Sequence, residues 1–498
     1  DTVQPPSYVK AKICANGSCR QCGYRNQCRY AQFLKQASAT RKFDFQITNH
    51  NLLLTSQRLK NSTGHGVLLD SNYYIIVEAH QLLEAANSVY GAEIMQNTIP
   101  DLLDSVKYTS KDKHARKQYR QLLTMTLEKN ADIFRNIGLC LDDGEDRCTI
   151  ELNERTIKDI SGILENLRKI EEFQTDSRKK RECKIVMEQF SVFMHPGAYL
   201  CWMELDRGNG MLSLCGVPTA MRGELNRNLW TMPNTHWVLT SGTMKDDTGF
   251  RYFKYELGIS GNIPEGATLE HSNGSPFDYK NHTRLYISEN VPFPDMDDPE
   301  YIQAVCDEIV KQVYATRGHT AILFTSYRML RMVYEKVKNR LLDYHLIQMT
   351  RSDKTAIGQF KKEKNSVLFA SGSMWEGVDC AGDVLSSVII VRLPFPLRSQ
   401  LMEYKKAQYD TVREFVQECA IPQMIIKLRQ GAGRLIRTEN DTGVIAILDS
   451  RAAKNGPYRE RVLTALSQYP LTPSIYGVEQ FISAVKGTEY LEGGRASA

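Results

Sequence analysis

The 498-residue sequence lacks long apolar runs and has little imbalance of charge. No stretch approaches the roughly 18 to 20 apolar residues that are needed to cross a bilayer. Residues 1–30 also lack the apolar centre of a signal peptide. These two absences argue against a membrane protein and against a secreted one. We therefore expect a cytoplasmic protein that has no membrane partner.

Cysteine is scarce outside one short segment. Of twelve cysteines, four fall between Cys14 and Cys28 and the others are scattered. This distribution is typical of a single metal site in a reducing compartment and argues against a disulfide framework. Lys and Arg total 63 against 58 Asp and Glu, and the net charge of +5 suits an anionic partner without identifying one.

The sequence also has no phosphate-binding loop of the form G-x-x-x-x-G-K-[ST]. The nearest phrase, STGHG at residues 62–66, lacks the lysine that would reach the β and γ phosphates of a nucleotide. The chain begins at Asp1 rather than Met and enters the cysteine cluster almost at once. We therefore expect an N-terminally truncated sequence whose loop-bearing segment lies before Asp1.

Length and composition, with 42% hydrophobic and 24% charged residues, predict a protein of several domains. Short runs rich in Val, Ile and Leu are each followed by a loop and a longer helical pattern, which is typical of parallel strands in an α/β sheet. The clearest runs are residues 73–77, 237–240, 321–325, 367–370, 388–393 and 444–448. Ligands of such sheets bind at the C-terminal ends of the strands, so we expect the chemistry there.

Between residues 80 and 194 the pattern changes to long amphipathic stretches, of which residues 115–134 and 156–173 are examples. This pattern predicts a helical insertion. Two basic clusters, residues 111–117 and 178–181, suit contact with a nucleic-acid backbone, and they equally suit a solvated helix face.

The clustered cysteines have the spacing C-x4-C-x2-C-x5-C, at Cys14, Cys19, Cys22 and Cys28. Four thiolates this close together predict a metal site. Sulfur ligands favour zinc or an iron-sulfur cluster, and the spacing does not choose between the two. We expect the metal to hold a small subdomain together rather than to carry out redox chemistry.

Polar residues follow two of the predicted strands. The strand at residues 73–77 ends in EAH, in which Glu78 is a candidate catalytic base and His80 a candidate coupling residue. Many NTPases place a magnesium-binding Asp directly before that base, and here Val77 occupies the position. Hydroxyl groups after residues 237–240, in the phrase LTSGTM, suit a polar relay between two sites.

Two later segments have the chemistry of a polyphosphate site. Small residues in SGSMWEGVD, residues 371–379, let the backbone approach a phosphate or a nucleic-acid strand, and Asp379 is placed to meet a ribose or a bridging water. In QGAGRLIR, Arg434 and Arg437 are three residues apart, which predicts one helix face from which two guanidinium groups reach the same polyphosphate. The alternative is a pair of surface arginines near a helix end.

Taken in order, nine motifs spread over the chain resemble the DinG branch of the XPD-like superfamily 2 helicases. They are the cysteine cluster, NHNLLL (49–54), EAH (78–80), LTSGTM (239–244), SPFDY (275–279), LFTSYRML (323–330), SGSMWEGVD (371–379), RLPFP (392–396) and QGAGRLIR (430–437). Each motif is weak alone, whereas their order and intervals are specific.

The resemblance implies an α/β fold with two RecA-like motor domains, the first incomplete, together with an iron-sulfur segment and a helical arch insertion. Its implied boundaries are 1–35 for the iron-sulfur domain, 36–82 and 200–260 for parts of motor domain 1, 83–199 for the arch, 261–490 for motor domain 2 and 491–498 for a tail. Motor domain 1 would leave a sheet edge exposed, which favours aggregation unless another segment completes it.

By the same resemblance, the protein is a monomeric 5′ to 3′ DNA helicase that uses ATP with Mg²⁺ on single-stranded, forked or R-loop-like DNA. Glu78 is then the catalytic base, and Gln430, Arg434 and Arg437 engage the ATP phosphates. His80, Gly433 and Asp379 complete the nucleotide site, and Trp375, Tyr327 and Arg328 are candidates for gripping single-stranded DNA. The cysteines at positions 14, 19, 22 and 28 are then the ligands of a [4Fe-4S] cluster.

Two departures from the family pattern keep other interpretations open. Without the phosphate-binding loop, this chain alone is not expected to hydrolyse ATP, and Val77 removes the expected magnesium ligand. The alternative is a catalytically inactive DNA-binding remnant of a helicase. A zinc-stapled interaction protein is a third hypothesis, and it would make the paired arginines a coincidence.

Overall fold

The computed structural model describes residues 23–37, 44–108, 111–140, 147–195, 197–206, 210–246, 248–261, 263–264, 266–349, 355–372 and 380–492. The chain divides into two compact units, one made of residues 1–76 and 81–238 and the other of residues 77–80 and 239–498. Among the described helices, none is long and apolar enough to cross a membrane.

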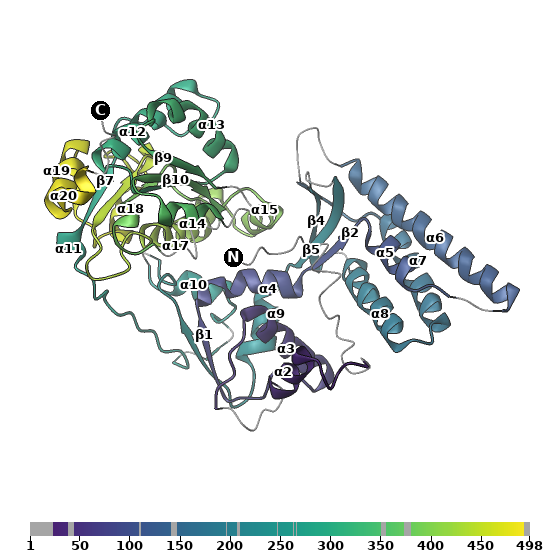
Figure 1. Cartoon of the computed structure of the whole chain (residues 1–498). Helices are drawn as coiled ribbons and strands as arrows, with labels where there is room; N and C mark the ends of the chain where they lie inside the picture. The colour runs from purple at the N-terminus through teal and green to yellow at the C-terminus, as the bar shows by residue number, and fades with distance from the viewer. Residues whose placement is uncertain are drawn as a thin grey trace. The chain divides into compact units, whose positions relative to one another are not determined.

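The second unit contains a seven-stranded parallel sheet in the order β13-β7-β12-β11-β8-β10-β9 (Figure 1). Its strands are β7 (Thr283–Ile287), β8 (Thr320–Phe324), β9 (His345–Gln348), β10 (Ser366–Ser371), β11 (Ser387–Ile390), β12 (Gly443–Ile447) and β13 (Leu471–Thr472). All residues of β8, β10, β11 and β12 are buried. Such continuous burial is the property of parallel strands that are covered on both faces.

Helices cover this sheet through two separate apolar clusters. Neighbouring residues of β8 show the division, because Leu323 belongs to one cluster and Ile322 to the other. The first cluster includes α14 (Thr355–Lys362), α17 (Ile421–Ala432) and α18 (Arg459–Ala465), and the second includes α12 (Pro299–Ala315), α13 (Tyr327–Val337) and α19 (Ile475–Val485). The unit also contains α10 (Arg251–Glu256), α11 (Tyr279–His282), α15 (Gln400–Lys406), α16 (Val412–Phe415) and α20 (Thr488–Glu492). The α/β architecture predicted from the sequence is confirmed.

Side-chain caps fix where several helices of this unit begin. Ser326 accepts a hydrogen bond from the backbone N–H of Met329 at 3.2 Å and starts α13 directly after β8. Asp298 caps α12 in the same way, with Pro299 at the first helical position. The short connection from β8 to α13 places the start of that helix at the C-terminal edge of the sheet.

The first unit contains a helical lobe built on a four-stranded antiparallel sheet of order β2-β5-β4-β3. Its elements are β2 (Ala92–Met95), α5 (Thr98–Ser105), α6 (Lys113–Gly138), β3 (Arg147–Thr149), α7 (Glu154–Phe173), α8 (Ser177–Ser191), β4 (Tyr199–Asp206) and β5 (Met211–Pro218). Met203 and Leu214 of the sheet share one apolar core with the helices. The lobe therefore continues to Pro218, beyond the arch boundary at residue 199 that the sequence analysis proposes, because β4 and β5 pair with β3 and β2. The assignment of the named domains stays a prediction.

The remaining elements of the first unit include α2 (Arg29–Ala37), α3 (His50–Thr63), α4 (Leu82–Tyr90) and α9 (Met221–Leu225). Asn49 caps α3 by accepting a hydrogen bond from the N–H of Leu52 at 2.8 Å, which gives the NHNLLL motif a structural role. In the described residues β1 (Tyr73–Val77) pairs with β6 (His236–Thr240) alone. Large apolar side chains of β1, those of Tyr73, Ile75 and Val77, are exposed on alternate positions.

Candidate nucleotide site

The end of β1 brings Glu78 into an uncommon backbone conformation. Its φ angle is +52°, in the left-handed region that residues other than glycine seldom adopt. Such a conformation costs on the order of 1 to 3 kcal/mol and is frequent at functional sites. The turn ends the strand and places the carboxylate beside the side chain of His80, with Glu78 Oε2 3.3 Å from His80 Nδ1.

Ser241, directly after β6, joins these two residues. Its Oγ lies 2.7 Å from Nδ1 of His80 and donates a hydrogen bond to Oε2 of Glu78 at 3.2 Å. The same oxygen accepts a hydrogen bond from the backbone N–H of Thr243 at 3.2 Å. The ends of β1 and β6 therefore form one polar cluster around a single hydroxyl group.

Thr243 extends this cluster to α17. Gln430, near the C-terminal end of that helix, is buried and donates a hydrogen bond from Nε2 to Oγ1 of Thr243 at 3.4 Å. A polar path thus runs from Glu78 through Ser241 to the backbone N–H of Thr243, and from the hydroxyl of Thr243 to Gln430. The relay that the sequence suggests for LTSGTM is present as geometry, and its role in catalysis is a proposal.

Arg429 holds the same loop and is absent from the sequence-based site. Its Nη1 donates to the backbone carbonyl of Lys245 and, at 3.3 Å, to that of Asp246, while its Nε donates to the carbonyl of Ala465 at 3.0 Å. Arg429 therefore fixes the segment after β6 against α17. The position of Arg429 directly before Gln430 of the QGAGRLIR motif could have drawn attention to it. The sequence does not reveal which backbone carbonyls it contacts.

The prediction that Arg434 and Arg437 share a helix face is wrong. The helix α17 ends at Ala432, with Gly433 as its C-cap, so both arginines lie beyond it. The residues between them, Leu435 and Ile436, are buried in the apolar cluster under the sheet. The chain therefore turns toward the apolar cluster after α17. The path of this non-helical backbone, and not helical periodicity, sets the positions of the two guanidinium groups.

Asp441 anchors the segment that carries Arg437. Its buried carboxylate accepts hydrogen bonds from the backbone N–H of Arg437 at 2.7 Å, from the N–H and hydroxyl of Thr438 at 2.8 and 2.7 Å, and from the N–H of Gly382 at 2.9 Å. Burial alone would raise the pKa of Asp441, but the hydrogen bonds from Thr438, Arg437 and Gly382 outweigh it and lower the pKa. The carboxylate is thus held ionised.

Hydrogen bonds hold both ends of the segment between β10 and β11, at Ser371 and at Gly382. The hydroxyl of Tyr327 donates to the carbonyl of Ser371 at 3.5 Å, and Gly372 follows with a φ of +67° that favours glycine. On the other side Gly382 is bonded to Asp441. Asp379 and Trp375 lie between these points, outside the described residues. Arg328 pairs with Asp297 at 3.3 Å on the exposed surface of the same unit.

Of the four predicted cysteine ligands, Cys28 alone lies in the described residues. Its backbone N–H donates to the carbonyl of Tyr24 at 2.9 Å, and it directly precedes α2. Cys14, Cys19 and Cys22 lie outside. Within the described ranges no group of three or more His, Cys, Asp or Glu side chains is arranged to hold a metal. The cysteine site therefore stays a prediction.

Comparison with known proteins gives consistent matches. Residues 309–469 match the family described as a helicase C-terminal domain. The chain is 28% identical over 482 residues to the "ATP-dependent DNA helicase YoaA" of Haemophilus influenzae, covering 93% of this chain and 72% of that protein. It is 26% identical over 517 residues to the "ATP-dependent DNA helicase DinG" of Photobacterium profundum, covering 89% and 70%.

Solved structures match the fold. The structure of S. tokodaii Xpd4 superposes with a TM-score of 0.54 at 18% identity, over 84% of this chain and 80% of that one. Another structure, titled "XPD_APO", gives 0.55 at 16% identity, over 85% and 81%. The fold and these matches define a helicase-type α/β protein with RecA-like architecture. Over most of its length the chain is similar to helicases named YoaA and DinG, and its fold is similar to that of the XPD structures.

Proposed function

We propose that this protein is an ATP-dependent DNA helicase that moves 5′ to 3′ on single-stranded DNA. The observation that carries the proposal is the polar path from Glu78 through Ser241 and Thr243 to Gln430. It connects the end of β1 with α17 through Thr243, whose backbone N–H contacts Ser241 and whose hydroxyl contacts Gln430. Relatives named as ATP-dependent DNA helicases support the same activity.

In this proposal Glu78 is the base that orients the attacking water, and His80 and Ser241 hold its carboxylate in place. Gln430, Arg434 and Arg437 engage the phosphates of ATP, where guanidinium groups stabilise the charge that develops during phosphoryl transfer. Gly433 lets the backbone approach the nucleotide, and Asp379 contacts the ribose or a bridging water. The bound Mg²⁺ would neutralise phosphate charge, but its fit is incomplete, because Val77 offers no oxygen ligand.

The missing phosphate-binding loop limits what the chain does alone. No G-x-x-x-x-G-K-[ST] sequence is present, so we propose that turnover needs a loop-bearing segment that this sequence does not contain. The exposed apolar side chains on β1 support this proposal, since strands of RecA-like sheets are normally covered on both faces. With that segment in place, the protein would work as a monomer on forked or R-loop-like DNA.

The four cysteines would hold a [4Fe-4S] cluster, with the thiolates of Cys14, Cys19, Cys22 and Cys28 as ligands. The chemistry of the donor set fits, because four closely spaced thiolates satisfy an iron-sulfur cluster. They satisfy zinc equally well. We favour the iron-sulfur cluster because the resemblance to DinG-type helicases implies one at these cysteines, and we assign it a structural role.

A second candidate function is that of a catalytically inactive helicase remnant that still binds DNA. The observation in its favour is Val77, whose exposed side chain replaces the magnesium-binding acid at the end of β1. The two candidates differ in turnover but not in DNA binding.

The test is strand separation on forked DNA by the chain extended with a segment that carries a phosphate-binding loop. We expect ATP-dependent unwinding from a 5′ single-stranded arm and much slower unwinding from a 3′ arm. Unwinding from the 3′ arm alone would contradict the direction. A loop-bearing form that binds DNA but neither unwinds it nor hydrolyses ATP would establish the remnant instead.

A further inference from the structure

The first half of α6 carries positive charge without compensation along the helix. From Lys113 to Leu127 the sequence KHARKQYRQLLTMTL contains no acidic residue. Lys113, Arg116, Lys117 and Arg120 are spaced by three and four residues, so they form one stripe along the helix, and all four are exposed. We call these four residues the α6 stripe.

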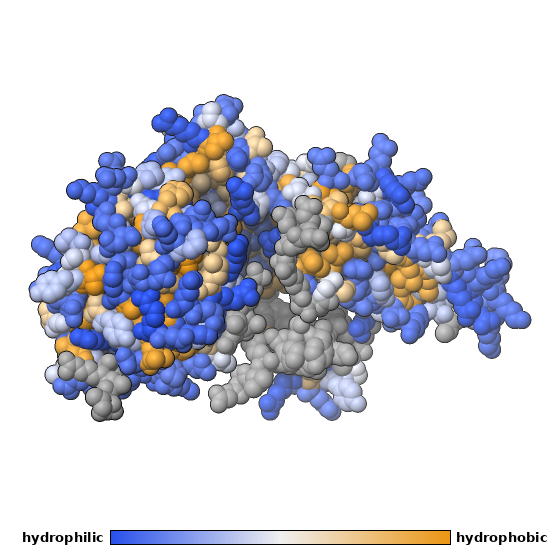
Figure 2. Space-filling view, turned by 90° about the horizontal axis from the view of Figure 1, so that it is seen from above, coloured by the Kyte–Doolittle hydropathy of each residue, from blue (hydrophilic) through white to orange (hydrophobic). Residues whose placement is uncertain are grey.

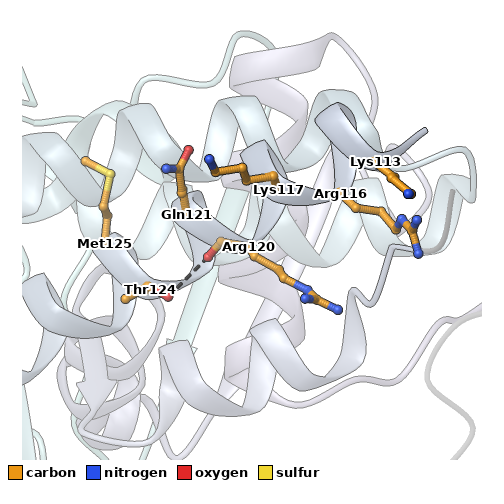
Figure 3. Close-up of a pocket in the computed structure, with 7 residues that line it drawn as sticks. All are labelled: Lys113, Arg116, Lys117, Arg120, Gln121, Thr124 and Met125. Carbon is orange, nitrogen blue, oxygen red and sulfur yellow. Dashed lines mark hydrogen bonds between the residues drawn. The ribbon is translucent and has the colours of Figure 1, made fainter. Parts of the chain in front are cut away.

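The α6 stripe borders a hollow on the surface of the lobe. Gln121, Thr124 and Met125 continue the same helix face, and the seven residues line the hollow together (Figure 3). Met125 is 48% exposed, so a large apolar side chain adjoins the charges. Hydrophilic side chains also gather over the outer end of the lobe (Figure 2).

The two halves of α6 differ in their ion pairs. In the second half Lys129 pairs with Asp159 of α7 at 3.0 Å, and Arg135 pairs with Asp132 at 2.9 Å. Among the residues that the structure describes, no ion pair involves the α6 stripe. Lys129 therefore links α6 to α7, and Arg135 is paired within α6, whereas no ion pair of the described residues neutralises the α6 stripe.

The other basic cluster of the lobe lies at the start of α8, and unlike the α6 stripe it makes polar contacts within the protein. Arg178 pairs with Glu182 at 3.0 Å, and Lys179 donates a hydrogen bond to the carbonyl of Lys107 at 3.3 Å. Both clusters lie at one end of the bundle, because Tyr119 of α6 and Gln174 after α7 both donate to the carbonyl of Val106. The α8 cluster is at least partly engaged within the protein, and the α6 stripe is the better candidate for an external anion.

We propose that the α6 stripe binds the phosphate backbone of single-stranded DNA outside the nucleotide site. This proposal rests on the proposed function, from which the substrate is taken. At 1.5 Å per residue the stripe extends over roughly 10 Å, which is long enough to face about two to three consecutive phosphates of one strand. Gln121 and Thr124 add polar groups of the kind that contact phosphate and sugar.

An acidic protein is the other partner class that a basic stripe suits. Protein interfaces usually have an apolar or aromatic centre, and among the described residues that line the hollow Met125 is the one large apolar side chain. The regular spacing of charges and the small apolar contribution favour a nucleic-acid backbone.

The test measures the affinity of the chain for a fluorescent oligothymidylate over a range of salt concentrations. The variant changes all four stripe residues to glutamine (Lys113→Gln, Arg116→Gln, Lys117→Gln and Arg120→Gln). The matched control changes four exposed basic residues of α7, Arg155, Lys158, Arg168 and Lys169, to glutamine, because α7 mixes them with acidic residues. Both variants remove the same charge from the same lobe.

Each phosphate contact contributes about 0.7 to the slope of log K against log salt for single strands. We expect the slope of the stripe variant to fall by up to about 2 and that of the control by less than half as much. Equal changes in both variants, or an unchanged slope in the stripe variant, would overturn the proposal. A stripe variant that keeps its DNA slope but loses binding to polyglutamate would assign the surface to an acidic protein and also overturn it.

ATP hydrolysis and the salt dependence of DNA binding together distinguish a wrong α6 stripe proposal from a wrong helicase proposal. A loop-bearing form that shows no ATP hydrolysis while the stripe variant still loses its salt slope would leave the DNA surface standing without the motor. Normal ATP hydrolysis with an unchanged slope would reject the stripe alone. Thermal unfolding of both variants checks that the lobe is intact, and the exposure of all eight side chains predicts little change.

Discussion

The Oγ of Ser241 lies 2.7 Å from Nδ1 of His80, so a residue directly after β6 contacts one from the turn after β1. The same hydroxyl reaches the carboxylate of Glu78. The side chain of Glu78 is 57% exposed, so these polar contacts rather than apolar packing hold its orientation. In this account Ser241 positions the base and passes changes there on to Thr243 and Gln430.

Replacing Ser241 by alanine tests this positioning role. The variant loses the hydrogen bonds to both partners, one of which is a charged but half-exposed carboxylate, so a loss of about 1 kcal/mol is expected. DNA-stimulated ATP hydrolysis by a loop-bearing form should fall about fivefold or more, with DNA affinity unchanged. Ser241→Thr keeps the hydroxyl and should restore most of the rate. Equal rates in the alanine and threonine variants would count against the relay.

Val77→Asp tests the interpretation of the altered magnesium position. The side chain of Val77 is 61% exposed, so a carboxylate there incurs little desolvation and should not destabilise the fold. In a loop-bearing form we expect the Mg²⁺ concentration that gives half-maximal ATP hydrolysis to fall several-fold. Val77→Asn, which lacks the charge, should give a smaller change. No shift in the Mg²⁺ dependence would mean that this position does not face the metal.

Asp441 predicts a pH dependence of stability. Its folded pKa is lowered, so its contribution is fully present above the unfolded value of about 3.9 and is lost as the pH falls through the folded pKa. Asp441→Asn should cost about 1 to 3 kcal/mol at neutral pH. Its urea unfolding should depend less on pH below about pH 4 than that of the parent. Parallel pH profiles for the two proteins would refute this assignment.

The cysteine site predicts a metal content. Protein purified without oxygen should contain about four irons per chain if the [4Fe-4S] proposal holds. Cys28→Ser should lose most of that iron together with the visible absorption. Cys140→Ser is the matched control, because Cys140 is an exposed free cysteine outside the motif. One zinc per chain in place of iron would decide for the alternative metal.

The sequence predicts β8, β10, β11 and β12 of the parallel sheet, since continuous apolar runs such as residues 367–370 become fully buried strands, and it does not single out β7, β9 or β13. It is wrong about Arg434 and Arg437, because a spacing of three residues does not reveal that α17 ends at Ala432. The turn there depends on the burial of Leu435 and Ile436 and on Asp441, which are tertiary effects. Likewise, strand propensity at residues 199–218 does not say which sheet the strands join.

DNA-stimulated ATP hydrolysis by a loop-bearing form of the chain tests the central claim most directly. We predict that Arg434→Ala or Arg437→Ala lowers the rate by about 10³-fold or more without weakening DNA binding, as arginines that contact a transferring phosphate do. Arg413→Ala, on the exposed surface of α16, should have no effect. DNA-stimulated hydrolysis that survives both arginine changes, or no hydrolysis in a DNA-binding parent, would contradict the account.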